Sequence, residues 1–453
     1  MLGEGKGLRP WVYYASSKGP FRTLHQWTGP LLIAFFLSLP WLQVGGERLL
    51  RIDILGRRLD LLGMTFGATD TRFLLVIVLT AALGLGLLTA LAGRLWCGWL
   101  CPQTVFLEGL IRPIEAWLEG DRGARMRLDK APWSLSKALR KGAKWSLFIG
   151  IAFLLSMTFV AVFSDPWRLW SAQAGPAAYA FVLGFTFLLA FDLGWFREQF
   201  CNYLCPYARI QGVLTDEHSW VIAYDTKRGE PRLRREGTTK PAVLARGGCV
   251  DCTRCVTVCP QGIDIREGFQ LECIACGHCI DACSEVMGKH GFPSLVTYTT
   301  EARQRGEKAR TLRVRPMAYV LLITGILGFG LAQFAARGDI EARFSRGRGG
   351  EVGYAADGRE QNRFQVHLWN HGAEATAFTL HITDWPEAQL VAPAAQLVMD
   401  AGAHRSVPVF VLVPAEGDHP ALHDFHVEVR AGSHVIERAA TFMRPSRQSA
   451  RTP

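Results

Sequence analysis

Residues 249–283 read CVDCTRCVTVCPQGIDIREGFQLECIACGHCIDAC and hold eight of the twelve cysteines of the chain. Three cysteines, each separated by two residues, are followed after three more residues by a fourth, and the pattern then occurs a second time. This is the spacing of bacterial proteins that bind two [4Fe–4S] clusters through cysteine thiolates. Pro260 follows the first set, as is usual, whereas Ser284 follows the second. The stretch therefore predicts a two-cluster, ferredoxin-like fold.

The spacing also predicts which cysteines share a cluster. A tight triplet supplies three ligands to one cluster, and the fourth cysteine of the run binds the other cluster. One cluster is assigned to Cys249, Cys252, Cys255 and Cys283, and the other to Cys259, Cys273, Cys276 and Cys279. Structural zinc is the alternative, but zinc sites usually show two well-separated pairs of ligands. His278 lies inside the second triplet and is expected to tune the cluster or to face solvent.

The remaining four cysteines form two pairs with a common pattern. CGWLCPQTVF begins at Cys97 and CNYLCPYARIQ begins at Cys201, so each motif reads Cys-x3-Cys-Pro. On a helix the two side chains of a pair would be neighbours, with Cβ atoms about 5–6 Å apart. The proline would end or restart the helix.

Two such pairs could form one metal site. Cysteine thiolates select Cu(I), zinc or the iron of iron–sulfur clusters. We therefore predict a soft-metal site with the ligands Cys97, Cys101, Cys201 and Cys205. The alternative is that these cysteines are small buried residues of helices.

Outside the cysteine motifs, apolar stretches alternate with basic ones. The chain has 453 residues, of which 49% are hydrophobic, and a formal net charge of +10. Five uncharged runs reach the roughly 18–20 residues that a helix needs to cross a bilayer. They are residues 28–46, 73–93, 145–164, 169–191 and 316–336. Basic edges on these runs disfavour the alternative of buried helices in a soluble protein. The first run lacks a small-residue cleavage site, so no cleavable signal peptide is expected.

The distribution of lysine and arginine predicts the orientation in the membrane. Residues 94–144 carry ten basic residues and residues 165–168 carry one. Because basic loops favour the cytoplasmic side, we expect residues 94–144 and 197–315 inside and everything after residue 336 outside. The basic loops then meet the anionic lipids of the inner leaflet, and no nucleic-acid partner is expected. All twelve cysteines then lie on the reducing side, where disulfides do not persist.

The expected architecture is a polytopic α-helical membrane protein with a cytoplasmic two-cluster insert and a C-terminal all-β sandwich. In the C-terminal part, apolar residues alternate in short runs such as NRFQVHLWNHG and FTLHIT, which is typical of antiparallel strands. The predicted parts are a cytoplasmic segment (1–27), a four-span domain with both Cys-x3-Cys-Pro motifs (28–215), the cluster domain (216–315), a fifth span (316–336) and a periplasmic domain (337–453).

Other polar residues carry weaker signals. Asp192 and Arg197, at the end of the fourth run, could relay protons or contact a quinone. The favoured alternative is that they are helix-end charges that extend to the membrane interface. The C-terminal part holds eight histidines, which could form an outward-facing copper site but are better explained as a solvated strand face. They are His367, His371, His381, His404, His419, His423, His426 and His434.

Several stretches together resemble the CcoG/FixG/RdxA family of cytochrome c oxidase accessory proteins. They are RLWCGWLCPQTVF, EGDRGARMRLDKAPWSL, REQFCNYLCPYARIQ, AYDTKRGEPR and the whole cluster stretch that ends at GKHGFP. The resemblance implies five spans, a cytoplasmic two-cluster region and a C-terminal immunoglobulin-like domain. It also implies a cupric reductase that supplies Cu(I) for the assembly of cbb-type haem–copper oxidase.

We therefore expect a membrane-bound electron-transfer protein, an oxidoreductase that reduces Cu(II) held near Cys97, Cys101, Cys201 and Cys205. The expected cofactors are two [4Fe–4S] clusters, with copper as the additional metal. The expected partners are copper ions, assembly factors of the cbb-type oxidase, a copper transporter, quinol and membrane lipid. The alternatives are a quinol-oxidising electron conduit to another reductase and a non-redox scaffold for oxidase assembly.

Overall fold

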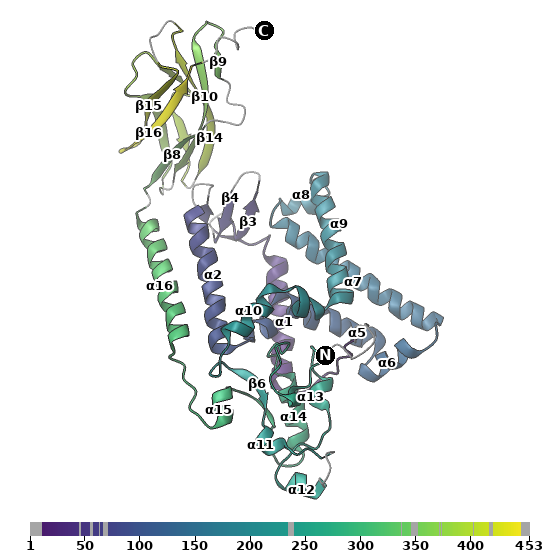
Figure 1. The fold of residues 1–453 in the computed structure, drawn as a ribbon. Coiled ribbons are helices and arrows are strands. Elements are labelled where there is room, and N and C mark those ends of the chain that lie inside the picture. Colours follow the sequence, from purple (N-terminus) through teal and green to yellow (C-terminus); the bar gives the residue numbers. More distant parts are fainter. Residues whose placement is uncertain are drawn as a thin grey trace. The chain divides into compact units, whose positions relative to one another are not determined.

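The computed structural model divides the chain into two compact units, Met1–Gly330 and Leu331–Pro453. It describes residues 11–44, 47–54, 58–62, 64–66, 71–233, 240–336, 338–345, 352–370, 372, 374–401, 403–415 and 420–444. Figure 1 shows a helical first unit and a second unit made of strands. The predicted membrane and cluster domains thus belong to one compact unit.

Four long apolar helices could cross a membrane by their length and composition. They are α2 (Thr71–Ala92), α7 (Leu135–Ala161), α9 (Pro176–Phe191), which continues into the π-helical turn η3 (Asp192–Phe196), and α16 (Val314–Ala335) (Figure 1). They correspond to the predicted runs 73–93, 145–164, 169–191 and 316–336. The start of the run at 169 is wrong, because Asp165 caps the separate helix α8 (Pro166–Trp170) and Pro176 begins α9.

The first predicted run, 28–46, corresponds only in part to a helix. Helix α1 (Pro20–Ser38) begins eight residues earlier, contains Pro30 and ends before the short strand β1 (Gln43–Val44). In the part of the chain that the structure describes, α1 is not among the helices that meet the criteria for crossing a membrane. The boundaries of this run are therefore wrong, and a fifth span stays a prediction.

The shorter elements of the first unit connect the long helices. They are β2 (Glu47–Arg48), β3 (Leu50–Asp53), β4 (Arg58–Leu61), β5 (Met64–Phe66), α3 (Leu95–Trp99), α4 (Pro102–Phe106), η2 (Leu107–Ile111), α5 (Arg112–Glu119), α6 (Arg122–Lys130), η4 (Phe200–Leu204), α10 (Pro206–Leu214), α11 (Thr226–Gly229), α12 (Lys240–Ala245), η5 (Ile265–Glu267) and α15 (Glu301–Arg305).

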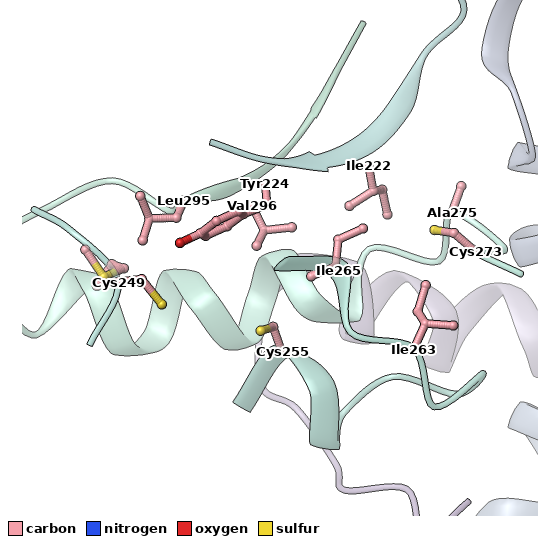
Figure 2. Close-up of a cluster of buried hydrophobic side chains, with 11 residues drawn as sticks. Ile222, Tyr224, Cys249, Cys255, Ile263, Ile265, Cys273, Ala275, Leu295 and Val296 are labelled. Carbon is pink, nitrogen blue, oxygen red and sulfur yellow. The ribbon is translucent and has the colours of Figure 1, made fainter. Parts of the chain in front are cut away.

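The cluster stretch folds around a small apolar core. Strand β6 (Val221–Tyr224) pairs antiparallel with β7 (Val296–Thr299), and the two lie beside α13 (Arg254–Thr257) and α14 (His278–Gly288). The core contains isoleucine, leucine and valine side chains together with three cysteines (Figure 2). In Figure 2, Cys249 and Cys273 lie at opposite ends of this core and Cys255 lies between them.

The second unit is an antiparallel β-sandwich, which confirms the predicted strands. One sheet has the order β12-β14-β10-β8, with β9 paired to β10, and the other has the order β13-β11-β15-β16. Their bounds are β8 (Ile340–Ser345), β9 (Val352–Tyr354), β10 (Glu360–Asn370), β11 (Thr376–Ile382), β12 (Gln389–Val391), β13 (Leu397–Met399), β14 (His404–Val413), β15 (Leu422–Ala431) and β16 (His434–Met443). Alternate residues such as Val366, Val409 and Val427 are fully buried, as the period-two pattern predicts.

Candidate metal centres

Two small cavities lie between the cysteines of the cluster stretch. Cys249, Cys252, Cys255 and Cys283 line one cavity of about 20 Å³, together with Tyr224 and Arg266. Cys259, Cys273, Cys276 and Cys279 line a second cavity of about 20 Å³, and Cys255 lies in the wall of both. The structure thus brings the eight cysteines together in the two sets on which the cluster prediction depends. We call them the first and the second cluster set.

In the loops around both cluster sets, backbone N–H groups point toward cysteine sulfur atoms. Asp251, Thr253 and Ala275 have positive φ angles between 52° and 56°, and Gly277 has φ 84°. Successive residues in such conformations turn their N–H groups toward one side of the chain, which creates a concave site for anions. The amide of Leu295 donates to Cys283 Sγ at 3.4 Å.

Burial and nearby backbone amide groups change the pKa of the thiols in opposite directions. Burial raises the pKa of Cys273 to about 11, and the amide of Ala275 acts against it. Burial also raises the pKa of Cys255 to about 12, and the cation of Arg266 acts against it. A buried thiolate is therefore stable here only when a positive charge compensates it, as the iron of a cluster does. These residues fit an anionic iron–sulfur cluster.

The four remaining cysteines meet at a third cavity, of about 180 Å³. Cys97 lies on α3 and Cys201 on the π-helical η4, whereas Cys101 and Cys205 are the residues that precede α4 and α10. We call this the membrane-edge cavity, because α3 follows α2 and η4 follows α9 and η3 along the chain. The two Cys-x3-Cys-Pro motifs are thus brought together.

The local geometry of each pair differs from the expectation. Cys101 and Cys205 are extended, with ψ 125° and ψ 111°, so neither pair lies on one continuous helix. The expectation of a continuous helix through each pair is therefore wrong, because one helix ends at the second cysteine, although both cysteines of each pair line the same cavity. Pro102 and Pro206 begin the next helices, which confirms that proline restarts the helix.

The membrane-edge cavity shares a wall with the second cluster set. Leu271, Glu272 and Ile274, which surround Cys273 in sequence, line the cavity. Cys97 packs in one buried group with Ile274 and Cys276, and Trp99 Nε1 donates to Ala275 O at 3.3 Å. A Cβ atom at Gly98 would lie 2.4 Å from Ile274 O, so the two backbones approach each other more closely than any other residue would allow.

Two histidines connect the N-terminal segment to the second cluster set. His25 Nε2 lies 3.1 Å from Cys276 O, and the His25 ring stacks on Trp99 with centroids 3.8 Å apart. Tyr14 Oη lies 3.2 Å from His278 Nδ1, and His278 is fully buried. Burial lowers the pKa of His278 to about 4, so the ring is neutral near pH 7. The solvent-facing role for His278 is therefore wrong, whereas a tuning role stays a prediction.

A buried network of ion pairs lies beside these residues. Glu115 forms ion pairs with Arg125, Arg197 and Lys144. Arg112 pairs with Glu108 and also donates to Pro260 O at 2.8 Å, directly after Cys259. Removing one partner of such a buried pair would leave the other charge uncompensated, which is strongly destabilising. The network thus anchors the second cluster set to α5 and η2.

Arg197 belongs to this network rather than to the membrane interface. It is 3% exposed, has φ 51° and lies over the ring of Trp11, with 4.4 Å to the centroid. The expectation that Arg197 extends to the interface is therefore wrong. Gln103, which lines the membrane-edge cavity, donates to Arg197 O at 3.2 Å. The proposed proton or quinone role of Asp192 and Arg197 stays a prediction.

The sequence alone does not reveal these long-range pairs. The one local signal is Glu108 and Arg112, four residues apart, which is a spacing that pairs charges on a helix.

The histidines of the sandwich are spread over its surface. His426 pairs with Asp384 at 2.7 Å, His367 and His404 stack with centroids 5.9 Å apart, and His423 packs on Trp385. His371 and His419 lie outside the described residues. In the part of the chain that the structure describes, no three histidine, cysteine or acidic side chains lie close enough together to hold one metal ion, and this includes the four cysteines of the membrane-edge cavity. The solvated strand face stays the favoured prediction for these histidines, and nothing in the described residues supports the alternative of a copper site.

Three family models match the chain. One, described as a 4Fe–4S dicluster domain, matches residues 196–301, and a second, described as a 4Fe–4S binding domain, matches residues 74–125. The third, described as an IG-like fold at the C-terminal of FixG, matches residues 330–445. They support an iron–sulfur protein with an immunoglobulin-like C-terminal domain.

Similar proteins of known name extend over most of the chain. Protein RdxA of Cereibacter sphaeroides is 35% identical over 390 residues, which cover 82% of each chain. Nitrogen fixation protein FixG of Rhizobium meliloti is 33% identical and covers 84% of this chain and 80% of its own. Protein RdxB of Cereibacter sphaeroides is 32% identical and covers 94% of both. Together with its two cluster sets and its sandwich, these similarities show that the chain is an iron–sulfur electron-transfer protein of the FixG/RdxA family.

Proposed function

We propose that this chain is a membrane-bound cupric reductase that supports copper delivery to cbb-type cytochrome c oxidase. The observation that carries the proposal is the wall that the membrane-edge cavity shares with the second cluster set. An electron acceptor held by Cys97, Cys101, Cys201 and Cys205 would lie next to the loop that carries Cys273 and Cys276. Two [4Fe–4S] clusters held by the eight cysteines would supply electrons one at a time, and Cu(II) would take up one electron to become Cu(I).

The chemistry of the cavity favours the reduced form of copper. Thiolates are soft ligands, which prefer Cu(I) over harder ions. Burial raises the pKa of Cys97 to about 12 and that of Cys201 to about 12, so both thiols are protonated near pH 7 when no metal is bound. Binding of the metal would therefore release protons. By stabilising Cu(I), the four cysteines would raise the driving force for the reduction.

The two cluster sets predict the iron content. Anaerobically purified protein should hold about eight iron and eight acid-labile sulfide, four of each per cluster. Iron and sulfide analysis, together with visible absorption, would measure this. Zinc at near-stoichiometric amount, without broad visible absorption, would contradict the assignment of Cys249, Cys252, Cys255 and Cys283 to one cluster and of Cys259, Cys273, Cys276 and Cys279 to the other.

The proposed reduction can be tested with purified protein. Chemically reduced protein would be mixed under argon with Cu(II) or with a soluble quinone, while the visible absorption of the clusters is followed. The proposal expects fast reoxidation by Cu(II) and the appearance of Cu(I), measured with a Cu(I)-specific chelator. Reoxidation by the quinone alone would favour a quinol-oxidising conduit, and reoxidation by neither would favour a scaffold.

A second candidate for the membrane-edge cavity is a third iron–sulfur cluster. The family model described as a 4Fe–4S binding domain matches residues 74–125, which contain Cys97 and Cys101 but none of the eight cysteines of the cluster stretch. A third cluster would raise the iron content to about twelve per chain. Iron analysis therefore separates this candidate from copper binding.

We also propose an orientation in the bacterial inner membrane, with the cluster sets in the cytoplasm and the sandwich in the periplasm. The basic residues of the segment 94–144 support it. A reporter that is active only in the periplasm should be active when fused after residue 337 and inactive when fused within residues 251–293. A reporter that is active only in the cytoplasm should show the opposite pattern. The reverse result would put the cysteines in an oxidising compartment and contradict the proposal.

A further inference from the structure

Arg94 is a buried cation at the boundary between the membrane-edge cavity and the second cluster set. It lies between α2 and α3, is 6% exposed and lines the cavity. Its guanidinium donates to Ala208 O at 2.8 Å, a backbone carbonyl of α10. Arg94 thereby connects the segment of the first cysteine pair with the segment that follows the second.

Arg94 differs from the other buried arginines of this unit. Arg112, Arg125 and Arg197 each form an ion pair with a glutamate. Among the described residues, no carboxylate lies within ion-pair distance of Arg94. Burying a charge is costly unless a countercharge compensates it. Glu272 lines the same cavity beyond ion-pair distance, and a closer countercharge can come from groups that become negative when the protein binds metal.

Thiols that lose their protons when they bind a metal are groups of this kind. Arg94 lines the same cavity as Cys97, and Ile274, the residue after Cys273, lines it as well. Cys97 belongs to the membrane-edge cavity and Cys273 to the second cluster set. A single guanidinium thus acts on the metal site and on the cluster set that lies against it.

We propose that Arg94 is the shared countercharge of the two sites. It compensates the thiolates that hold a metal in the membrane-edge cavity, and it stabilises the additional negative charge that the second cluster set carries when reduced. Net charge near a cluster is one of the factors that set its reduction potential. Arg94 therefore raises the potential of the second cluster relative to the first, so that electrons collect beside the cavity. The part of this inference that concerns copper rests on the proposed function.

The test is a charge-removing substitution with two independent readouts. In Arg94→Met protein, the midpoint potential of the second cluster should fall while that of the first stays unchanged, measured by redox titration with EPR in the absence of copper. The affinity for Cu(I), measured by competition with a chelator, should fall roughly 10- to 100-fold, as for other groups that support metal ligands. Arg94→Lys keeps the positive charge and should retain most of the midpoint potential of the second cluster and of the affinity for Cu(I). If the Arg94→Met protein does not fold, the same two measurements are made on the Arg94→Lys protein.

Two further variants test the direction of the change in potential and whether the change is limited to charges beside the second cluster set. Glu272 also lines the cavity, so Glu272→Gln should raise the midpoint potential of the second cluster. Arg246, an exposed arginine three residues before Cys249, is the matched control, and Arg246→Met should leave the midpoint potential of the second cluster unchanged.

Equal changes in the potentials of both clusters, or no change in Arg94→Met protein with full iron content, would overturn the inference. If the cluster potential falls but Cu(I) affinity stays constant, the shared role of Arg94 is wrong. If Cu(I) binding does not depend on the cysteine pairs at all, the proposed function fails independently of the cluster result.

Discussion

Replacing Cys201 and Cys205 together with serine is expected to abolish reoxidation of the reduced protein by Cu(II) while the iron content stays at its normal value. Both residues line the membrane-edge cavity, and neither lines a cavity of the two cluster sets. Serine exchanges a soft thiolate for a hard hydroxyl that binds Cu(I) poorly. Since the loss of a supporting group alone costs 10- to 100-fold in metal affinity, the loss of two ligands should cost more than about 100-fold.

The packing around the pair makes misfolding an unconvincing explanation for such a loss. Cys201 and Cys205 are both partly exposed, and serine has nearly the same shape as cysteine. The measurement compares iron, acid-labile sulfide, EPR of the reduced clusters and the rate of reoxidation by Cu(II) in the same preparation. Cys255→Ser is the matched control, because it removes a thiol from the cluster stretch. It should lose cluster signal while it retains Cu(I) binding.

Two outcomes would contradict the assignment of this pair. If the Cys201→Ser/Cys205→Ser protein loses iron in proportion to its activity, the four membrane-edge cysteines hold a cluster. If it keeps both clusters and full reduction of Cu(II), the pairs are structural and copper meets the electrons elsewhere.

The features that the sequence predicts well are those that depend on near neighbours. The cysteine spacing of the cluster stretch is local, and so are the apolar runs of α2, α7 and α16 and the alternation in β10 and β15. Each of these patterns repeats over a few residues, because a loop, a helix or a strand imposes its own period. The helices and strands predicted from these patterns therefore correspond to observed elements, whereas the boundaries of the run at 28–46 and the start of the run at 169 do not.

The features that the sequence does not predict depend on residues far apart in the chain. His278 is buried because Tyr14 covers it, 264 residues away, and Arg197 is buried because Glu115 pairs with it, 82 residues away. No periodic pattern in the sequence predicts such contacts. The helix break at Cys101 and Cys205 is also missed, since Cys-x3-Cys fits a continuous helix as well as an interrupted one. That the two cysteine pairs line one cavity could be inferred only from their identical sequence pattern.

Gly98 shows how such a long-range contact can control function. Replacing Gly98 with alanine should slow Cu(II)-dependent reoxidation several-fold and should destabilise the protein. The added Cβ would lie 2.4 Å from Ile274 O and 3.2 Å from the Cα atom of Cys276, both of which belong to the backbone. Backbone atoms cannot rotate away as a side chain can, so the segment of the first cysteine pair and the second cluster loop must separate. Overpacking of this kind costs about 1–3 kcal/mol of stability.

The separation should also change the rate, because electron transfer falls steeply with distance. The added distance between the membrane-edge cavity and the second cluster set should therefore slow the transfer of the electron. Stopped-flow absorption after mixing reduced protein with Cu(II) measures the rate, and thermal unfolding in detergent measures the stability. Gly288→Ala is the matched control, since a Cβ at Gly288 of α14 would meet nothing within 4 Å. Iron content should be normal in both variants, because neither residue is a cysteine of a cluster set. If Gly98→Ala protein reoxidises as fast as Gly288→Ala protein, the close approach at Gly98 does not carry the electron, and the shared wall is a packing contact alone.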